Sequence, residues 1–302
     1  MALASGHQTG FRHEITKKGK NENCATITAK GTMALQRERD WMNRDFSTAR
    51  RIVVKVGTSV VSKDNGDANA QWAKQFASQI RLLQTAGREI IVVSSGAIGA
   101  GRFVLGLKER PRTLIEKQAA AAAGQLRLMR VYHDAFKAAG VPVAQVLLTY
   151  DDLDSKLRCR NAKNTIDLLL RMGVVPIINE NDTVAVEEIT FGDNDYLSAL
   201  AFELSGADML ILLTDVQGVL NNVTVARKDA EVIATVSRRE VAGLERGIGA
   251  ATSSSGTGGM KSKVQAARTA VERGGVAVIA CGKTPRVLVR IVAGEPIGTL
   301  FS

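Results

Sequence analysis

From residue 51 onward, short runs of valine, isoleucine and leucine alternate with longer segments whose apolar residues recur at helical spacing. Strands of this composition are typical of a parallel sheet that is buried on both faces by the intervening helices. The pattern predicts an α/β fold, a three-layer αβα sandwich with a mainly parallel central sheet. The predicted strands are 52–56, 89–93, 142–148, 174–178, 209–213 and 276–280, and the predicted helices are 70–86, 115–139, 161–172, 195–205 and 260–273.

The flanking and connecting segments have a different character. Residues 1–48 have weak periodicity and contain the polar stretch 17–23, so we expect a disordered N-terminal extension before a single domain at 49–302. Met33 opens a repeat of the first three residues and is a candidate alternative start. The alternating apolar residues of Thr183 to Gly192 predict a hairpin that projects beyond the sheet as a lid.

Composition narrows the class of protein. The 302 residues carry 40 Lys and Arg against 30 Asp and Glu, a net charge of +10. The basic residues are spread along the chain and aromatics make up only 4%, so we expect phosphate-bearing substrates and no nucleic acid partner. No apolar run approaches the roughly 18 to 20 residues that span a bilayer, and no secretory leader is evident, so we expect a cytoplasmic protein with no membrane partner.

Cysteine usage agrees with that expectation. Cys24, Cys159 and Cys281 are far apart and have no neighbouring cysteine or histidine at metal-ligand spacing. We therefore expect inert thiols in a reducing compartment and no metal held by cysteine.

Three glycine turns follow predicted strands or precede a helix. They are Lys55–Ser59, Ser94–Gly101 and Gly256–Lys263. Glycine lets the backbone approach a phosphate, and the first N–H groups of a following helix attract anions. A single turn of this kind is common where nothing binds, but three in one chain, two of them with lysine, favour phosphate handling.

Two familiar nucleotide motifs do not fit. The glycines at 96, 99 and 101 are in the wrong order for a dinucleotide fingerprint. Gly282-Lys283-Thr284 resembles the end of a P-loop, but Ala277 stands where the first glycine of that motif belongs. The sequence therefore supports neither a Rossmann oxidoreductase nor a P-loop ATPase.

Acidic and amide residues gather in Asn179–Asp182 and Gly192–Asp195, after a strand and before a helix. Their oxygens could bind the ammonium group of an amino acid, or they could serve only as turn and helix-cap residues. Asp195 in particular is a good candidate for an N-cap. The residue pattern leaves both interpretations open.

Six motifs, in order and at the expected approximate spacing, resemble the amino acid kinase family over 51–302. They are Val54–Ser59, Ser95–Gly101, Pro176–Asp182, Gly192–Leu200, Leu212–Asp215 and Gly256–Met260. The likeness is strongest to family members that act on free glutamate. It implies the family's fold and ATP-dependent phosphorylation of the γ-carboxylate of L-glutamate to L-glutamyl 5-phosphate, the first step of proline biosynthesis.

The resemblance also implies roles for individual residues. Lys55 and Lys263 would reach the nucleotide phosphates, Asp195 would orient these lysines, and the N–H groups of Gly57 and Gly96 would contact the transferred phosphoryl group. Glutamate would be held by three residues, Ser95, Asp182 and Asn194. ATP would be held by Lys55, Thr214, Asp215, Thr257, Gly258, Gly259, Met260, Lys261, Ser262 and Lys263.

Further implications concern cofactors and partners. Mg²⁺ would be held mainly by the ATP phosphates, proline would act as a feedback inhibitor, and the protein would form a homodimer or homotetramer. The sequence departs from the family pattern at Ser262, where threonine is expected, and it stops where many bacterial relatives continue into a PUA domain, so we expect no such domain here.

Two alternative functions remain. Another kinase of this family, acting on N-acetylglutamate, aspartate, carbamate or UMP, would have a similar sheet and ATP site. A non-catalytic amino-acid sensor or RNA-binding protein with this fold would also explain the basic composition, although Lys55 and Lys263 favour a kinase.

Overall fold

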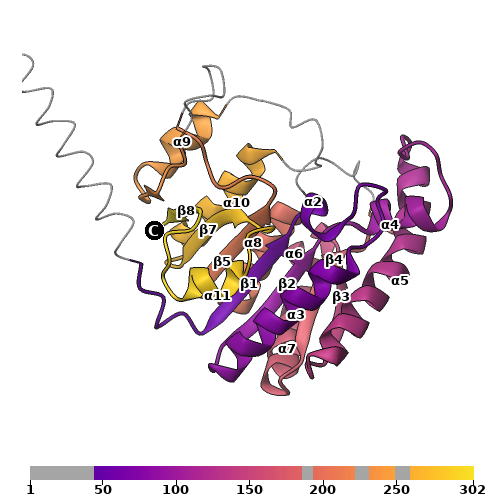
Figure 1. Ribbon diagram of the computed structural model, residues 1–302, viewed down its shortest axis with the longest axis horizontal. Coiled ribbons are helices and arrows are strands. Elements are labelled where there is room, and N and C mark those ends of the chain that lie inside the picture. The colour runs from indigo at the N-terminus through magenta and orange to yellow at the C-terminus, as the bar shows by residue number, and fades with distance from the viewer. Residues whose placement is uncertain (1–43, 186–192, 222–230, 249–258) are drawn as a thin grey trace, which may run out of the picture. The chain divides into compact units, whose positions relative to one another are not determined.

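The computed structural model describes residues 44–185, 193–221, 231–248 and 259–302. In these residues eight strands form one sheet in the order β3-β4-β2-β1-β5-β7-β8-β6, in which all neighbours are parallel except the antiparallel pair β7 and β8. Figure 1 shows the strands side by side. They are β1 (Arg51–Val56), β2 (Glu89–Ser94), β3 (Val143–Leu148), β4 (Val175–Glu180), β5 (Met209–Thr214), β6 (Thr235–Val236), β7 (Val276–Cys281) and β8 (Thr299–Phe301).

Helices cover both faces of the sheet. One apolar cluster joins α3, α5 and α11 to the sheet, and a second cluster joins α7, α8 and α10 to its other face. The three predicted layers are therefore confirmed (Figure 1). The helices of the described residues are α2 (Thr58–Val61), α3 (Ala70–Thr85), α4 (Ala97–Val104), α5 (Leu114–Ala138), α6 (Tyr150–Asp154), α7 (Lys156–Arg171), α8 (Asp193–Ser205), α9 (Val241–Gly247), α10 (Met260–Glu272) and α11 (Val287–Val292).

Strand β1 illustrates why these sequences form central strands. Successive side chains of a strand point to opposite faces of the sheet. Ile52 and Val54 accordingly enter the cluster under α3 and α5, while Val53 enters the cluster under α8 and α10. By the same alternation, Lys55 projects to the α8 and α10 side, where it is only 4% exposed. A lysine at such a position requires a partner in the layer above it.

The six predicted strands and five predicted helices are all present, and none of their ends differs from the prediction by more than five residues. The elements that the sequence pattern did not predict include α4, which begins directly at a glycine turn, and the short strand β8, which lies between β7 and β6. The lid predicted for Thr183 to Gly192 lies largely outside the described residues, as do residues 1–43 of the predicted extension.

The folded domain begins earlier than predicted. The extension was expected to run to residue 48, but Arg44 and Phe46 are buried. The Arg44 guanidinium donates to the carbonyls of Ala234, Ile297 and Gly298 at 2.7, 2.7 and 3.0 Å. These residues carry no periodic pattern, because their contacts are with segments that are distant in sequence.

Helices α4 and α5 pack with their backbones in direct contact. A Cβ atom added at Gly101 of α4 would lie 1.7 Å from the carbonyl oxygen of Ala120, and one added at Gly124 of α5 would lie 1.8 Å from that of Ala97. No residue larger than glycine fits at either position without separating the helices. This contact holds the start of α4, which follows β2, against the middle of α5.

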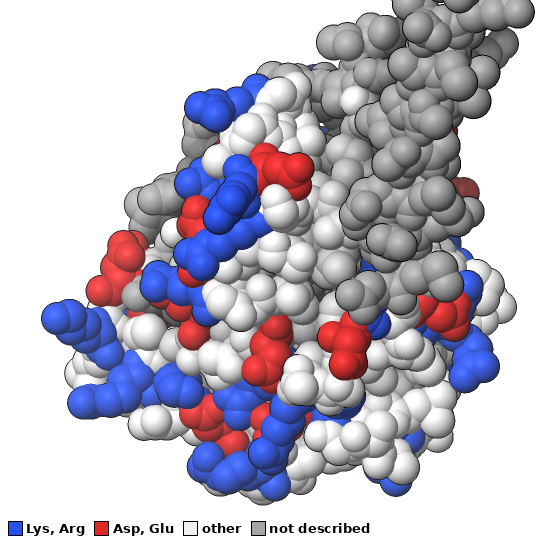
Figure 2. Space-filling model, turned by 90° about the vertical axis from the view of Figure 1, so that its left-hand side faces the viewer, with Lys and Arg blue, Asp and Glu red and all other residues white. Residues whose placement is uncertain are grey.

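Charged side chains of both signs are mixed on the surface. Figure 2 shows lysine and arginine interspersed with aspartate and glutamate on the face that it displays. Arg268, for example, pairs with Glu245 at 3.1 Å and with Glu272 at 2.7 Å. Within the described residues, every helix is too short or too polar to traverse a bilayer.

The glycine contact gives a testable prediction about stability. We expect Gly124→Ala to lower the free energy of unfolding by at least about 2 kcal/mol, because the new methyl group overpacks the α4–α5 contact. Gly243→Ala in α9 is the matched control, since no atom lies within 4 Å of its added Cβ and alanine favours a helix. Thermal denaturation of both variants tests this, and unchanged melting of Gly124→Ala would contradict it.

Candidate active site

Polar and charged side chains gather at the carboxyl ends of the central strands. Lys55 lies near the end of β1, Ser95 follows β2, Asn179 lies near the end of β4, and Thr214 ends β5. Open α/β sheets bind their ligands at this edge. The sheet order places β1 between β2 and β5, so these groups lie along one edge of neighbouring strands.

A buried carboxylate joins two lysines at this edge. Asp195 Oδ1 lies 2.7 Å from Lys55 Nζ, and Asp195 Oδ2 lies 3.1 Å from Lys263 Nζ. The three residues are 0%, 4% and 6% exposed, respectively. They come from α8, β1 and α10, so the packing of α8 and α10 on one face of the sheet assembles the cluster. Asp195 lies in the first turn of α8, and its side chain bonds these groups of other elements.

The electrostatics of this cluster keep its charges in place. Burial disfavours ionisation of Asp195, but the ammonium groups of Lys55 and Lys263 outweigh burial and hold the pKa of Asp195 below its usual value. Burial lowers the pKa of Lys263, an effect that Asp195 opposes and Lys55 reinforces. The cluster therefore holds two positive charges next to one negative charge, in a site that is almost fully buried from water.

The first turn of α10 contributes a hydroxyl group. Ser262 Oγ donates to Asp195 Oδ2 at 2.7 Å and lies 2.8 Å from the Gly259 carbonyl oxygen. Serine at this position therefore retains the hydroxyl contact that a threonine would offer. Lys261 is exposed and lies outside the cluster, and Met260 begins the helix. Thr257 and Gly258 lie outside the described residues.

The two glycines that were predicted to contact the phosphoryl group have different surroundings in the structure. The N–H of Gly57 donates to the carbonyl of Leu213 at 3.0 Å, so in this structure it bonds the neighbouring strand. Gly57 instead fastens the end of β1 to β5, and a Cβ added there would lie 3.9 Å from Lys55 Nζ. Gly96 has φ of 106° and precedes α4, and an added Cβ would lie 2.8 Å from Val61. Only glycine is suited to that backbone conformation.

An amide network continues from this cluster toward β4. Asn194 Nδ2 donates to Ser95 Oγ at 3.1 Å, to the Ser94 carbonyl at 3.3 Å and to Asn179 Oδ1 at 3.1 Å. Asn179 Nδ2 in turn donates to Gln125 Oε1 at 2.8 Å. The structure therefore brings the predicted residues Ser95 and Asn194 together.

The remaining predicted residues lie around these two groups. Asp182 is half-buried in the turn after β4. Thr214 is buried at the end of β5, and its hydroxyl donates to Asp215 Oδ1 at 3.1 Å, while Asp215 itself is exposed. The Thr214 carbonyl accepts from the Gly282 N–H at 2.8 Å, which ties this strand end to the turn after β7.

The sequence pattern placed Asn179 within the candidate amino-acid-binding segment 179–182 but gave it no role of its own, and it did not indicate Gln125 at all. Gln125 lies in the middle of a long helix whose residues read as ordinary amphipathic sequence. Its participation depends on the glycine contact between α4 and α5, which no local pattern reveals.

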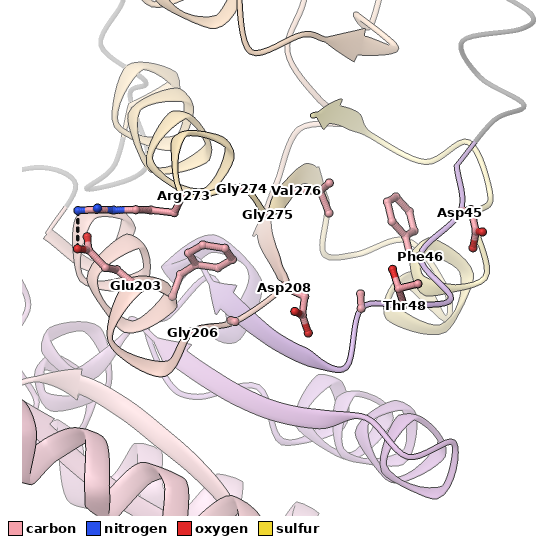
Figure 3. Close-up of a pocket in the computed structure, with 13 residues that line it drawn as sticks. Asp45, Phe46, Thr48, Glu203, Gly206, Asp208, Arg273, Gly274, Gly275 and Val276 are labelled. Carbon is pink, nitrogen blue, oxygen red and sulfur yellow. Dashed lines mark ion pairs between the residues drawn. The ribbon is translucent and has the colours of Figure 1, made fainter.

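A cavity of about 590 Å³ lies at the opposite, amino ends of β1, β5 and β7 (Figure 3). Its charged groups already have partners. Glu203 pairs with Arg273 at 2.5 Å, and Asp208 Oδ2 accepts from the N–H groups of Arg50 and Arg51 at 2.8 Å. This cavity is far from the lysine cluster and offers no comparable set of groups.

Two solved structures share the fold. A UMP kinase from Bacillus anthracis aligns with a TM-score of 0.56 at 15% identity, covering 84% of this chain and 96% of that one. An isopentenyl phosphate kinase of T. acidophilum, solved as a product complex, aligns with a TM-score of 0.57 at 16% identity, covering 83% and 100%. At these identities the likeness concerns the fold alone.

Sequence comparison is more specific. Glutamate 5-kinases of Citrifermentans bemidjiense, Caulobacter vibrioides and Moorella thermoacetica are 47%, 47% and 48% identical over 254, 253 and 258 residues. These alignments cover 83–85% of this chain and 67–68% of the relatives. The model of the amino acid kinase family matches residues 50–281. With the buried lysine cluster in the fold described above, these matches establish that the chain belongs to the amino acid kinase family.

Proposed function

We propose that this chain transfers the γ-phosphoryl group of ATP to the side-chain carboxylate of L-glutamate. The product is L-glutamyl 5-phosphate, and the reaction is the first step of proline biosynthesis. The observation that carries the proposal is the buried pair of lysines on Asp195, directly beside a network of amide and hydroxyl groups. Relatives named glutamate 5-kinase, at 45–48% identity, support glutamate as the acceptor.

The chemistry needs charge neutralisation more than proton transfer. A carboxylate with a solution pKa of about 4.3 is ionised at neutral pH, so its attack on phosphorus requires no general base. Negative charge on the phosphoryl oxygens must be stabilised during transfer. We assign this role to Lys55 and Lys263, with Asp195 holding both ammonium groups in position. The backbone N–H of Gly96 would also contact the phosphoryl group. Gly57 has no side chain and would leave space for that group beside Lys55.

The nucleotide and the amino acid would bind on different sides of this cluster. We assign ATP to Thr214, Asp215 and the segment from Thr257 to Lys263, next to β5 and the start of α10. We assign glutamate to Ser95, Asp182 and Asn194, next to β2 and β4. In this arrangement the γ-carboxylate meets the γ-phosphate near Lys55, between the two sets of residues.

Magnesium would enter with the nucleotide. Among the described residues no group of three or more His, Cys, Asp or Glu side chains could hold a metal ion. Both oxygens of Asp195 are engaged by Lys55, Lys263 and Ser262, so this carboxylate could ligate a cation only by giving up an ammonium partner. The residues therefore fit Mg²⁺ bound mainly by the ATP phosphates, whose negative charge it would neutralise.

The resemblance supports three further proposals. The enzyme would act in the cytoplasm, proline would inhibit it near the glutamate site, and it would form a homodimer or homotetramer. Several exposed apolar side chains close together in the chain fit an oligomer, because exposed apolar surface is often covered by a partner. Phe103, Val104, Leu105 and Leu107 at the end of α4 are 40–49% exposed.

An acceptor assay tests the proposed function. With ATP and Mg²⁺, a hydroxylamine trap should capture acyl phosphate from L-glutamate, and little from aspartate or N-acetylglutamate. Preference for N-acetylglutamate, aspartate, carbamate or UMP would identify a different kinase of the family. No ATP consumption with any acceptor, together with a salt-sensitive RNA complex, would favour a non-catalytic protein.

The buried lysine of α10 gives a second prediction. Lys263→Met should lower kcat at least about a hundredfold with a smaller effect on the KM for ATP, because its ammonium matters most in the transition state. Asp195 keeps Lys55 as a partner, so the variant should remain folded. Lys261→Met removes the same charge from an exposed position of the same turn and should lower kcat much less. An inactive Lys261→Met with an active Lys263→Met would reverse the assignment.

The pKa shifts predict the pH dependence. Since burial lowers the pKa of Lys263 below the ordinary 10.5, kcat at saturating substrates should begin to fall at a pH below that value as the ammonium loses its proton. Asp195 has a pKa below its ordinary 3.8 and stays charged throughout, so it adds no acidic limb above that pH. No histidine limb should occur between about pH 6 and 8.

Lys263→Arg tests the origin of the alkaline fall. A guanidinium keeps its proton in this range, so the variant should lose the alkaline limb even where its kcat is lower. Steady-state rates with acyl-phosphate detection, measured over the same pH series, provide the comparison. An alkaline limb of unchanged midpoint in Lys263→Arg would show that another group titrates.

A further inference from the structure

The amide network beside the lysine cluster contains two buried side-chain atoms that lack a hydrogen-bond partner among the described residues. They are Gln125 Nε2, a donor, and Asn194 Oδ1, an acceptor. A buried polar atom without a hydrogen-bond partner is energetically costly, so two such atoms in one network indicate a place where a ligand can bind. The two residues are linked through Asn179, which bonds Gln125 at 2.8 Å and Asn194 at 3.1 Å.

The unsatisfied atoms match the charged end of an amino acid. A free carboxylate accepts hydrogen bonds and an ammonium group donates them, so an α-amino acid supplies one partner for each atom. The network itself carries no formal charge, since it consists of serine hydroxyl and amide groups. Neutral donors and acceptors can hold a zwitterion without repelling either of its charges.

The order of the strands sets the direction of the substrate. The lysine cluster lies at β1 and α10, whereas Asn179 lies on β4, beyond β2 in the sheet. Gln125 reaches Asn179 of β4 from α5, which packs on the opposite face of the sheet from α8 and α10. A glutamate whose γ-carboxylate meets the lysines therefore extends its α-amino and α-carboxylate groups toward this network.

We propose that Gln125 is a substrate-binding residue whose side-chain N–H donates to the α-carboxylate of glutamate, while Asn194 Oδ1 accepts from the ammonium group. This inference rests on the proposed function and extends it to a residue of α5. Its position is explained by its neighbour: Gly124 contacts the backbone of α4 directly and thereby brings the next residue within reach of Asn179.

Gln125→Glu tests the proposal, because it separates a binding role from a structural one. The glutamate side chain keeps an oxygen for the bond from Asn179, but it loses the N–H donors and places negative charge near the substrate carboxylate. We expect the KM for glutamate to rise at least about tenfold, with kcat and the KM for ATP within about twofold. Gln75→Glu makes the same change at an exposed position of α3 and should match the wild type.

A second variant and a binding measurement complete the test. Gln125→Met removes the donor without adding charge and should raise the KM for glutamate by a smaller factor. Calorimetric titration of the protein with glutamate, in the absence of nucleotide, measures binding independently of turnover. The inference would be overturned if both variants bind glutamate as tightly as the wild type does. It would also be overturned if the variants melt at a lower temperature while their KM for glutamate is unchanged.

The same measurements separate this inference from the proposed function. If the wild type binds glutamate without phosphorylating it and Gln125→Glu abolishes binding, the kinase assignment fails and the role of Gln125 stands. If the wild type phosphorylates glutamate and Gln125→Glu has an unchanged KM, the role of Gln125 fails alone. A wild type that neither binds nor phosphorylates glutamate would overturn both.

Discussion

The attachment of two ammonium groups to the carboxylate of Asp195 is the interaction on which the site depends. Lys55 and Lys263 come from β1 and α10, and the carboxylate between them comes from α8. Removing one partner from a buried ion pair costs about 3–5 kcal/mol, because the remaining charge is left uncompensated. Here the carboxylate has two partners, so the cluster serves as a fixed source of positive charge whose position is set by the packing of two helices on one face of the sheet.

A second constraint operates on the other face of the sheet. Gly101 and Gly124 allow α4 and α5 to touch along their backbones, and the atoms nearest to both glycines across the contact are backbone atoms. It orients the turn at Gly96 and the amide of Gln125 at the same time. The two faces therefore meet at one edge: α8 and α10 supply Asn194, Asp195 and Lys263, and α5 supplies the amide of Gln125.

The presence of both charged and neutral groups at this edge has a physical reason. Charge that develops during transfer is best stabilised by cations held in a poorly hydrated place, where electrostatic interactions are strong. An amino acid substrate carries charges of both signs at its α-carbon. The amide and hydroxyl groups of Asn194 and Ser95 can bind either sign, beside the carboxylate of Asp182 that we assign to the same substrate.

The sequence by itself determined the fold class, the six long strands and the identity of most charged residues at the site. Strand and helix periodicity are local, and Lys55, Asp195 and Lys263 stand in motifs whose order can be read directly. Tertiary structure alone decided three hydrogen bonds. The Gly57 N–H donates to the Leu213 carbonyl, the Arg44 guanidinium donates to the Gly298 carbonyl 254 positions away, and Asn179 donates to Gln125. Each of these depends on groups that are far apart in the chain and meet only when the layers pack, so no spacing along the sequence could reveal them.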